Sequence, residues 1–108
     1  MILSGKSAEI LVFSKRAKGH DQVTQFLIDN GVNLANFDKQ ERRSIHWASS
    51  AGHYHVVRLL IENGAEVNCA DKTKCTPIHL AAANGYAQVV QMLGKSLNSG
   101  TLYNLYTL

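Results

Sequence analysis

The most regular feature of the sequence is a helical spacing of apolar residues that occurs twice, in residues 54–62 and again in residues 87–93. Apolar side chains recur there at intervals of three and four residues, the spacing that gathers them on one face of an α-helix. A shorter helix is predicted ahead of each, over residues 44–51 and 77–84. In both cases a glycine separates the short helix from the long one. The pattern therefore predicts two copies of a short helix, a tight turn and a second helix.

These copies belong to an internal repeat with a period of 33 residues. When residues 38–60 are aligned with residues 71–93, nine of the 23 positions are identical, and Ile45/Ile78 is one such pair. Residues 19–38 align with residues 52–71 at the same offset, with eight identities in 20 positions. Two separate overlaps with one period indicate a repeat protein, in which each unit buries its apolar face against its neighbours.

The residues at the ends of the predicted helices support this interpretation. Thr76 is a suitable N-cap, and Pro77 follows at the first helical position, where its missing N–H does no harm. Gly31 and Gly64 follow the long helices at the position where a left-handed residue ends a helix. We therefore expect an all-α solenoid of about three helix-turn-helix units joined by hairpin-like loops. Residues 1–108 would form one domain with a degenerate first unit over 1–37, a second over 38–70, a curtailed third over 71–97 and a non-repeat tail over 98–108.

Two segments, CTPIHLAAANGYAQVVQML at residues 75–93 and GAEVNCAD at residues 64–71, resemble the ankyrin repeat family. The T-P-[LI]-H-x-A signature of that family is nearly intact in the third unit, and the resemblance extends over residues 19–93. It implies an ankyrin-repeat solenoid, in which small residues let the helices of adjacent units approach closely. A weaker resemblance links FDKQERRSIHWA at residues 37–48 to the ankyrin-repeat regulatory subunits of protein phosphatase 6.

The resemblance implies structural roles for residues that would otherwise suggest chemistry. Three histidines fall within residues 44–55, and histidine is both a proton-transfer group and a metal ligand. The histidine of the signature characteristically hydrogen-bonds within and between units, and His20 and His53 follow a turn glycine where the family commonly has histidine; only His55 falls outside the pattern, and we expect it to be solvated. The residues with implied structural roles are His46, His79, Gly31, Gly52, Gly64 and Gly85, together with Ala48, Ala81 and Ala82 between the units.

A zinc site is the main chemical alternative, built from Cys69, Cys75, His46 and His79. No CxxC pair is present, and histidines spaced by one repeat lie one unit apart along a solenoid and do not converge. We therefore expect no metal and no cofactor. The stretch SGKS at residues 4–7 lacks the first glycine of a phosphate-binding loop, so it predicts no nucleotide site.

Composition narrows the class of protein. A chain of 108 residues has room for one domain, and 45% hydrophobic with 18% charged residues is typical of a globular protein. The formal charge of +3 is too small to predict nucleic-acid binding, although it suits acidic partners. Two cysteines and no signal peptide indicate a reducing compartment, cytoplasmic or nuclear. The apolar run at residues 10–13 is too short to span a membrane.

Repeat solenoids generally act as binding surfaces, because stacking exposes an extended face whose side chains can vary without disturbing the core. No converging acid, base or nucleophile is visible in the sequence, so we expect no enzyme. The prediction is a monomeric, non-catalytic protein–protein interaction module, a scaffold or a fragment of a regulatory subunit. Two alternatives stay open: a small ankyrin-type inhibitor of an enzyme and, less favoured, a metal-dependent enzyme that uses the His/Cys set.

The usual contact positions of the ankyrin family carry over to ten residues of this chain. With Arg43 and Lys74 nearby, these positions bring together five cations against Asp38, Glu41 and Asp71, which predicts a protein partner with an acidic segment. The ten predicted partner-binding residues are Lys39, Gln40, Arg42, Ser50 and Ala51 in the second unit, and Lys72, Thr73, Cys75, Ala83 and Asn84 in the third.

The sequence also departs from the ankyrin pattern. Arg43-Ser44 replaces Thr-Pro in the second unit, and Trp47 stands where leucine is usual, so we expect it to pack. Glu41 and Lys74 occupy positions where the family often has a turn glycine. The signature is lost before Gly19. It also stops after Leu93: Leu97 replaces the expected glycine, and the tail NSGTLYNLYTL does not continue the repeat.

Overall fold

The structure, a computed structural model, describes residues 21–97 and contains five α-helices and no strand within that range. They are α2 (Asp21–Asp29), α3 (Ser44–Ala51), α4 (Tyr54–Glu62), α5 (Pro77–Ala83) and α6 (Ala87–Ser96). The predicted all-α class is therefore confirmed. The predicted short helices are also confirmed, since α3 has the expected bounds and α5 ends one residue early, with Asn84 as its C-cap.

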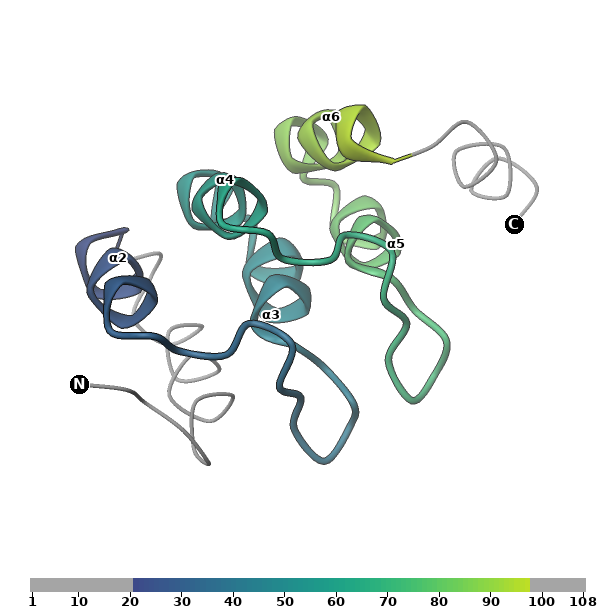
Figure 1. Ribbon diagram of the computed structural model, residues 1–108. Coiled ribbons are helices and arrows are strands. Elements are labelled where there is room, and N and C mark those ends of the chain that lie inside the picture. The colour runs from purple at the N-terminus through teal and green to yellow at the C-terminus, as the bar shows by residue number, and fades with distance from the viewer. Residues whose placement is uncertain (1–20, 98–108) are drawn as a thin grey trace.

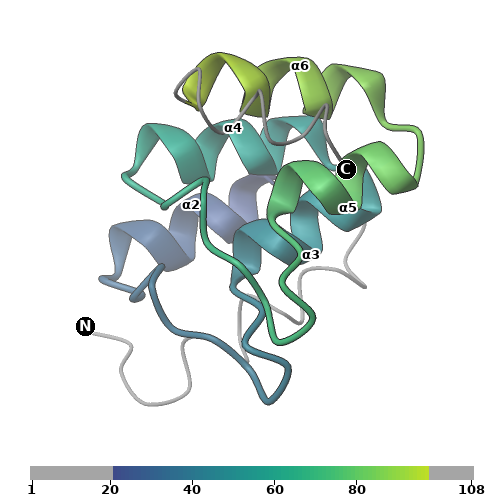
Figure 2. The ribbon, with the colours of Figure 1, turned by 90° about the vertical axis from the view of Figure 1, so that its right-hand side faces the viewer.

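The helices form two rows (Figure 1). The short helices α3 and α5 pack against each other in an inner row, and the longer helices α2, α4 and α6 stand side by side in an outer row. Two loops, residues 37–43 and residues 70–76, project from the inner row on the same side. After a turn of 90° the helices of the two rows run nearly parallel, and both loops still extend from the same edge (Figure 2).

The core repeats from one unit to the next. Ile45 in α3 and Ile78 in α5 are each 1% exposed, so the 33-residue period places the same side chain in the same environment. Leu60 and Leu93, the corresponding residues of α4 and α6, have no exposed surface. Each buried leucine or isoleucine contributes about 1.5–3 kcal/mol relative to an exposed position. The stacking is therefore stabilised mainly by this repeated apolar contact.

The turns have the backbone geometry that the sequence predicts. Gly31 and Gly64 follow α2 and α4 with φ of 83° and 91°, which confirms the left-handed helix ends. Glu41 and Lys74 have φ of 60° and 67°, the region that favours the glycine they replace. Leu97 is extended, with φ of −94° and ψ of 156°, because a side chain disfavours the left-handed conformation that a glycine would adopt there.

One expectation about packing is wrong. Ala82 was expected between adjacent units, together with Ala48 and Ala81, but only the last two are buried and Ala82 is exposed. Its counterpart one unit earlier, Ser49, is fully buried. The reason is positional: Ser49 is covered by the unit that follows it, whereas no residue of the range 21–97 covers the equivalent face of the third unit. The predicted degenerate unit before Gly19 and the tail over 98–108 lie outside the described residues.

Candidate functional site

The two loops are copies of one turn, and an aspartate organises each of them. Oδ1 of Asp38 accepts the backbone N–H groups of Gln40 and Arg42, at 2.9 and 3.0 Å. Oδ1 of Asp71 accepts those of Thr73 and Cys75, at 2.8 and 2.9 Å. A carboxylate that accepts bonds from residues two and four positions later fixes the loop that follows it. Both loops therefore present their tips, residues 39–41 and residues 72–74, in the same way.

The loops are also joined to each other. The backbone N–H of Lys72 donates to the carbonyl oxygen of Gln40 at 2.8 Å. Arg42 Nε lies 3.0 Å from Asp71 Oδ2, in a pair whose carboxylate side chain is only 1% exposed. Arg43 Nη1 lies 3.2 Å from Glu66 Oε2, in a more exposed pair. The tips therefore form one surface that spans two units.

The electrostatics of Asp71 follow from these bonds. Burial by itself would raise the pKa of its carboxyl group, because it disfavours the charged form. Hydrogen bonds from Thr73, from the Cys75 amide and from Arg42 outweigh that effect and lower the pKa of Asp71 to about 2. Asp71 is therefore an anion at neutral pH, and its charge is used inside the scaffold.

His46 connects the inner helix to the next loop. Its Nδ1 accepts the Arg43 N–H at 3.0 Å, so Nε2 carries the proton and donates to the Cys75 carbonyl at 3.2 Å. Burial lowers the pKa of His46, because the imidazolium form would lose its solvation; the Cys75 carbonyl and the Asp71 charge oppose this shift. His79 makes the corresponding bond inside its own unit, where its Nδ1 lies 3.3 Å from Thr76 N and 2.9 Å from Thr76 Oγ1.

Trp47 belongs to the same network, which the sequence did not reveal. Its Nε1 donates to Asp38 Oδ2 at 2.9 Å, and the guanidinium of Arg42 lies 4.9 Å from the centre of a Trp47 ring. The indole is half-buried, so it packs as expected and also fixes the aspartate of the first loop. The 33-residue spacing of Asp38 and Asp71 could have shown their common role, but it does not show which side chains would bind them.

The structure brings the ten predicted partner-binding residues to one side of the molecule but divides them by exposure. The exposed ones are Lys39, Gln40, Lys72, Thr73, Ala83 and Asn84, and the half-buried ones are Arg42, Ser50, Ala51 and Cys75. Asn84 Nδ2 donates to the Ser50 carbonyl at 3.0 Å and so links the two inner helices. Arg42 is held by Asp71 and Trp47. The groups that remain available to a partner are therefore chiefly those at the loop tips.

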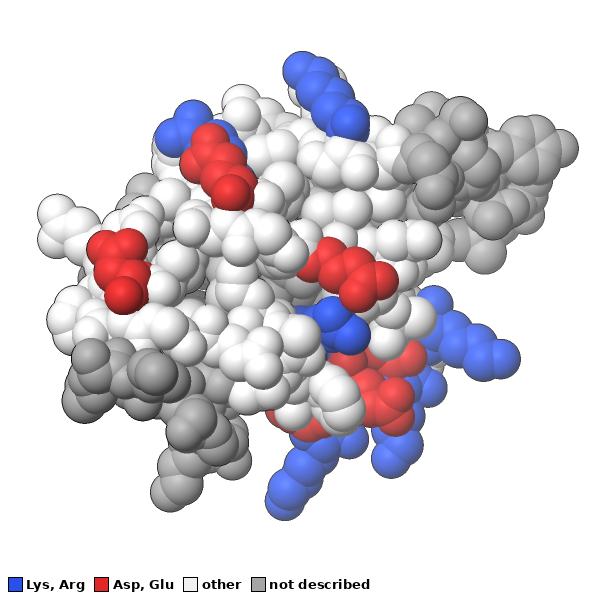
Figure 3. All heavy atoms as spheres, viewed as in Figure 1, with Lys and Arg blue, Asp and Glu red and all other residues white. Residues whose placement is uncertain are grey.

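Charge is concentrated at the same place. Figure 3 shows Lys and Arg side chains that project from the edge where the loops end, around a smaller group of acidic atoms. Within residues 21–97, the lysines Lys39, Lys72 and Lys74 are exposed and make no ion pair. Exposed cations without an intramolecular partner keep their potential for a ligand.

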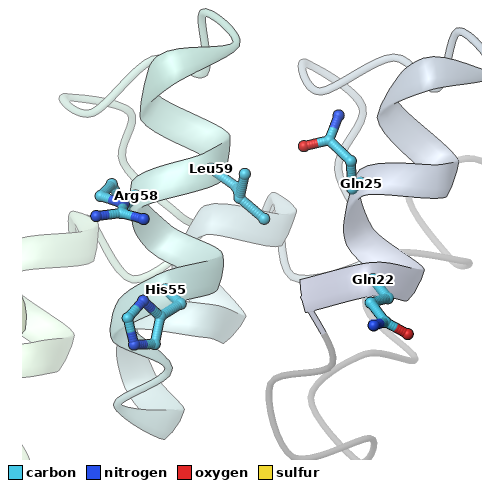
Figure 4. Close-up of a pocket in the computed structure, with 5 residues that line it drawn as sticks. All are labelled: Gln22, Gln25, His55, Arg58 and Leu59. Atoms are coloured by element: carbon cyan, nitrogen blue, oxygen red, sulfur yellow. The ribbon is translucent and has the colours of Figure 1, made fainter.

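Other candidate sites offer less. A pocket of about 250 Å³ lies between α2 and α4, where Gln25 and Leu59 point into the space between the helices (Figure 4). Its lining, which also includes Gln22, His55 and Arg58, contains no carboxylate or nucleophile. No group of three or more His, Cys, Asp or Glu residues is placed to hold a metal in the described part of the chain. Both cysteines are free thiols, and burial raises the pKa of Cys69. No helix among residues 21–97 is long and apolar enough to cross a membrane.

The comparisons with known proteins agree with this architecture. A family model described as ankyrin repeats, in three copies, matches residues 10–104. A search of curated proteins gave no significant match, so the weaker resemblance to the phosphatase 6 subunits gains no support. Ankyrin repeats bind other proteins, and the loops and inner helices described above are the part of this chain that presents a shared surface. The helix pairs, the 33-residue period and the family match together establish that the chain belongs to the ankyrin repeat family.

Proposed function

We propose that the chain binds another protein through the loop tips and the exposed ends of the inner helices, and that the bound segment is acidic. The observation that carries this proposal is the row of three exposed lysines, Lys39, Lys72 and Lys74, which make no ion pair within the described residues. Glu41 is the acidic residue among the tips, so the tips carry a net positive charge.

The charge that supports the proposal differs from the charge counted in the sequence. Arg42 and Arg43 were included among five cations, but each already has a carboxylate partner within the chain, Asp71 and Glu66. The attraction for an acidic segment therefore comes from the lysines. Their mobile ammonium groups suit an extended partner with several carboxylates, because each can follow a different one.

A selection experiment tests the proposal. The immobilised chain is used to select from a displayed library of random peptides, in parallel with the triple variant Lys39→Glu, Lys72→Glu, Lys74→Glu. A matched control, Arg58→Glu with Lys95→Glu, changes exposed cations of the outer helices and leaves the tips intact. Wild type and control should enrich peptides rich in Asp and Glu, and the triple variant should lose that enrichment. Equal enrichment by all three proteins would contradict the proposal.

The role that we propose for this binding is that of a non-catalytic scaffold or regulatory subunit, acting as a monomer in the cytoplasm or nucleus. The free thiols of Cys69 and Cys75 support a reducing compartment. The second candidate is an inhibitor that covers the active site of its partner enzyme. An activity assay on the captured enzyme separates the two, because a scaffold leaves turnover unchanged and an inhibitor abolishes it.

A further inference from the structure

The third unit presents to its open side the groups that the second unit uses to hold its neighbour. In the second unit, the Gln40 carbonyl accepts the Lys72 N–H at 2.8 Å, and His46 Nε2 donates to the Cys75 carbonyl at 3.2 Å. The equivalent groups 33 residues later are the Thr73 carbonyl and His79 Nε2. Neither has a hydrogen-bond partner within residues 21–97. The edge of residues 71–79 is therefore built like an occupied interface but has no occupant there.

The charges at this edge differ from those of the second unit in an informative way. The second unit contributes Arg42 and Arg43 to its interface, and they pair with Asp71 and Glu66 of the third. The equivalent positions of the third unit, at residues 75 and 76, are a cysteine and a threonine, both neutral. Any segment that continues the stack against this edge therefore needs no acidic residue, and an acidic one would find no cation there.

Residues 98–108 have the matching character. At the 33-residue offset, Ser99 and Asn104 correspond to Glu66 and Asp71, so both members of each former ion pair are neutral together. The eleven residues NSGTLYNLYTL contain no charged side chain at all. Asn104 can also do the work of Asp38 and Asp71 in the two loops, because an asparagine Oδ1 accepts the backbone N–H groups of a following turn as an aspartate does.

We propose that residues 98–108, which lie outside the described range, dock on the edge of residues 71–79 as a third loop in the same register. In this arrangement Asn104 Oδ1 accepts the N–H groups of Tyr106 and Leu108. The Leu105 N–H donates to the Thr73 carbonyl, and His79 Nε2 donates to the main-chain oxygen of Leu108. The stack is thereby closed on this side by a segment that lacks the repeat signature but keeps its contact positions.

The different path at Leu97 is compatible with this docking. Leu97 is extended, whereas Gly64 at the equivalent place turns left-handed, so the chain leaves α6 in another direction. Six residues, 98–103, separate it from Asn104, and six residues can span about 20 Å. Gly100 lies among them and permits a turn. Resting on the proposed function, the docked loop adds Leu105 and Tyr106 to the row of tips, so the acidic partner segment would also offer an apolar residue.

Amide hydrogen exchange of the full chain, followed by NMR without any partner, tests the docking. The amides of Leu105, Tyr106 and Leu108 should exchange at least tenfold more slowly than in a free peptide NSGTLYNLYTL. Asn104→Ala should remove the protection of these amides, whereas Asn104→Asp and the matched control Asn98→Ala should retain it.

Three results would overturn the docking. They are peptide-like exchange in the wild type, protection that survives Asn104→Ala, and protection that falls on dilution, which would indicate a second copy at the edge. Because no partner is present, failure here leaves the proposed function standing.

Discussion

The ring of Tyr86 lies against the turn of Gly52 in the preceding unit, so close that a Cβ added to Gly52 would come within 2.7 Å of its carbons. Gly52 also has a φ of 76°, a conformation that residues with a side chain rarely adopt. Gly85 has nearly the same φ, 78°, but no atom lies within 4 Å of an added Cβ. The two glycines therefore separate backbone strain from packing.

Gly52→Ala should destabilise the protein more than Gly85→Ala. Both substitutions place a side chain in the left-handed region, at about 1–2 kcal/mol each. Only Gly52→Ala must also displace an aromatic ring. Urea unfolding followed by circular dichroism measures the difference, and the excess should vanish in a Tyr86→Ala background. Equal losses in the wild-type background would mean that Tyr86 does not pack on the turn.

Glu41→Gly and Lys74→Gly should each stabilise the protein. Both residues have positive φ at equivalent places in the two loops. Glycine removes the steric strain there, and after the entropy it adds to the unfolded chain the gain should be about 0.5–1 kcal/mol. Gln40→Gly is the control, since Gln40 does not have a positive φ. A fall in melting temperature for the first two variants would show that their side chains hold the loops in place.

Ionised Asp71 should make stability depend on pH in the acid range. Its pKa is about 2 in the folded chain and 3.8 in the reference state, so the unfolded chain binds the proton more readily. The contribution is therefore fully present above pH 3.8 and is lost as pH falls toward 2. Its size is about 2 kcal/mol. Asp71→Asn should flatten this part of the pH–stability curve, and a curve unchanged by the substitution would contradict the assignment.

His46 should add a second dependence at higher pH. Its pKa is lowered from 6.5 by burial, so the unfolded chain binds the proton first as pH falls. Stability is complete above that value and declines as pH drops below it, until the lowered pKa is reached. His46→Gln should remove the decline near pH 6.5, and the exposed His55→Gln should keep it. Thermal melts between pH 5 and pH 8, the range in which an ordinary histidine titrates, provide the measurement.

Leu60→Ala should remove the most deeply placed side chain of α4. Leu60 has no exposed surface and belongs to the core shared by the second and third units. A leucine truncated in such a site costs about 2–5 kcal/mol. The exposed Arg58→Ala on the same helix is the control and should change stability little. A cooperative melt near the wild-type temperature for Leu60→Ala would contradict the stacking register.

The sequence predicted the period, the short helices and the left-handed glycines, because these depend on local patterns that recur every 33 residues. It did not predict that Arg42 would be held by Asp71 and Trp47, because that contact joins residues of different units. The exposure of Ala82 was missed for a related reason: burial in a repeat depends on the next unit, which local spacing does not reveal. Equivalent positions share a backbone environment but not always a neighbour.

Backbone NMR shifts of the chain, measured while an acidic peptide from the selection is added, test the central claim most directly. The account predicts that the amides that move lie at residues 39–41 and 72–74 and at the exposed end of α5, around Ala83 and Asn84. Movement confined to the outer helices α2, α4 and α6, with the tips unchanged, would contradict it.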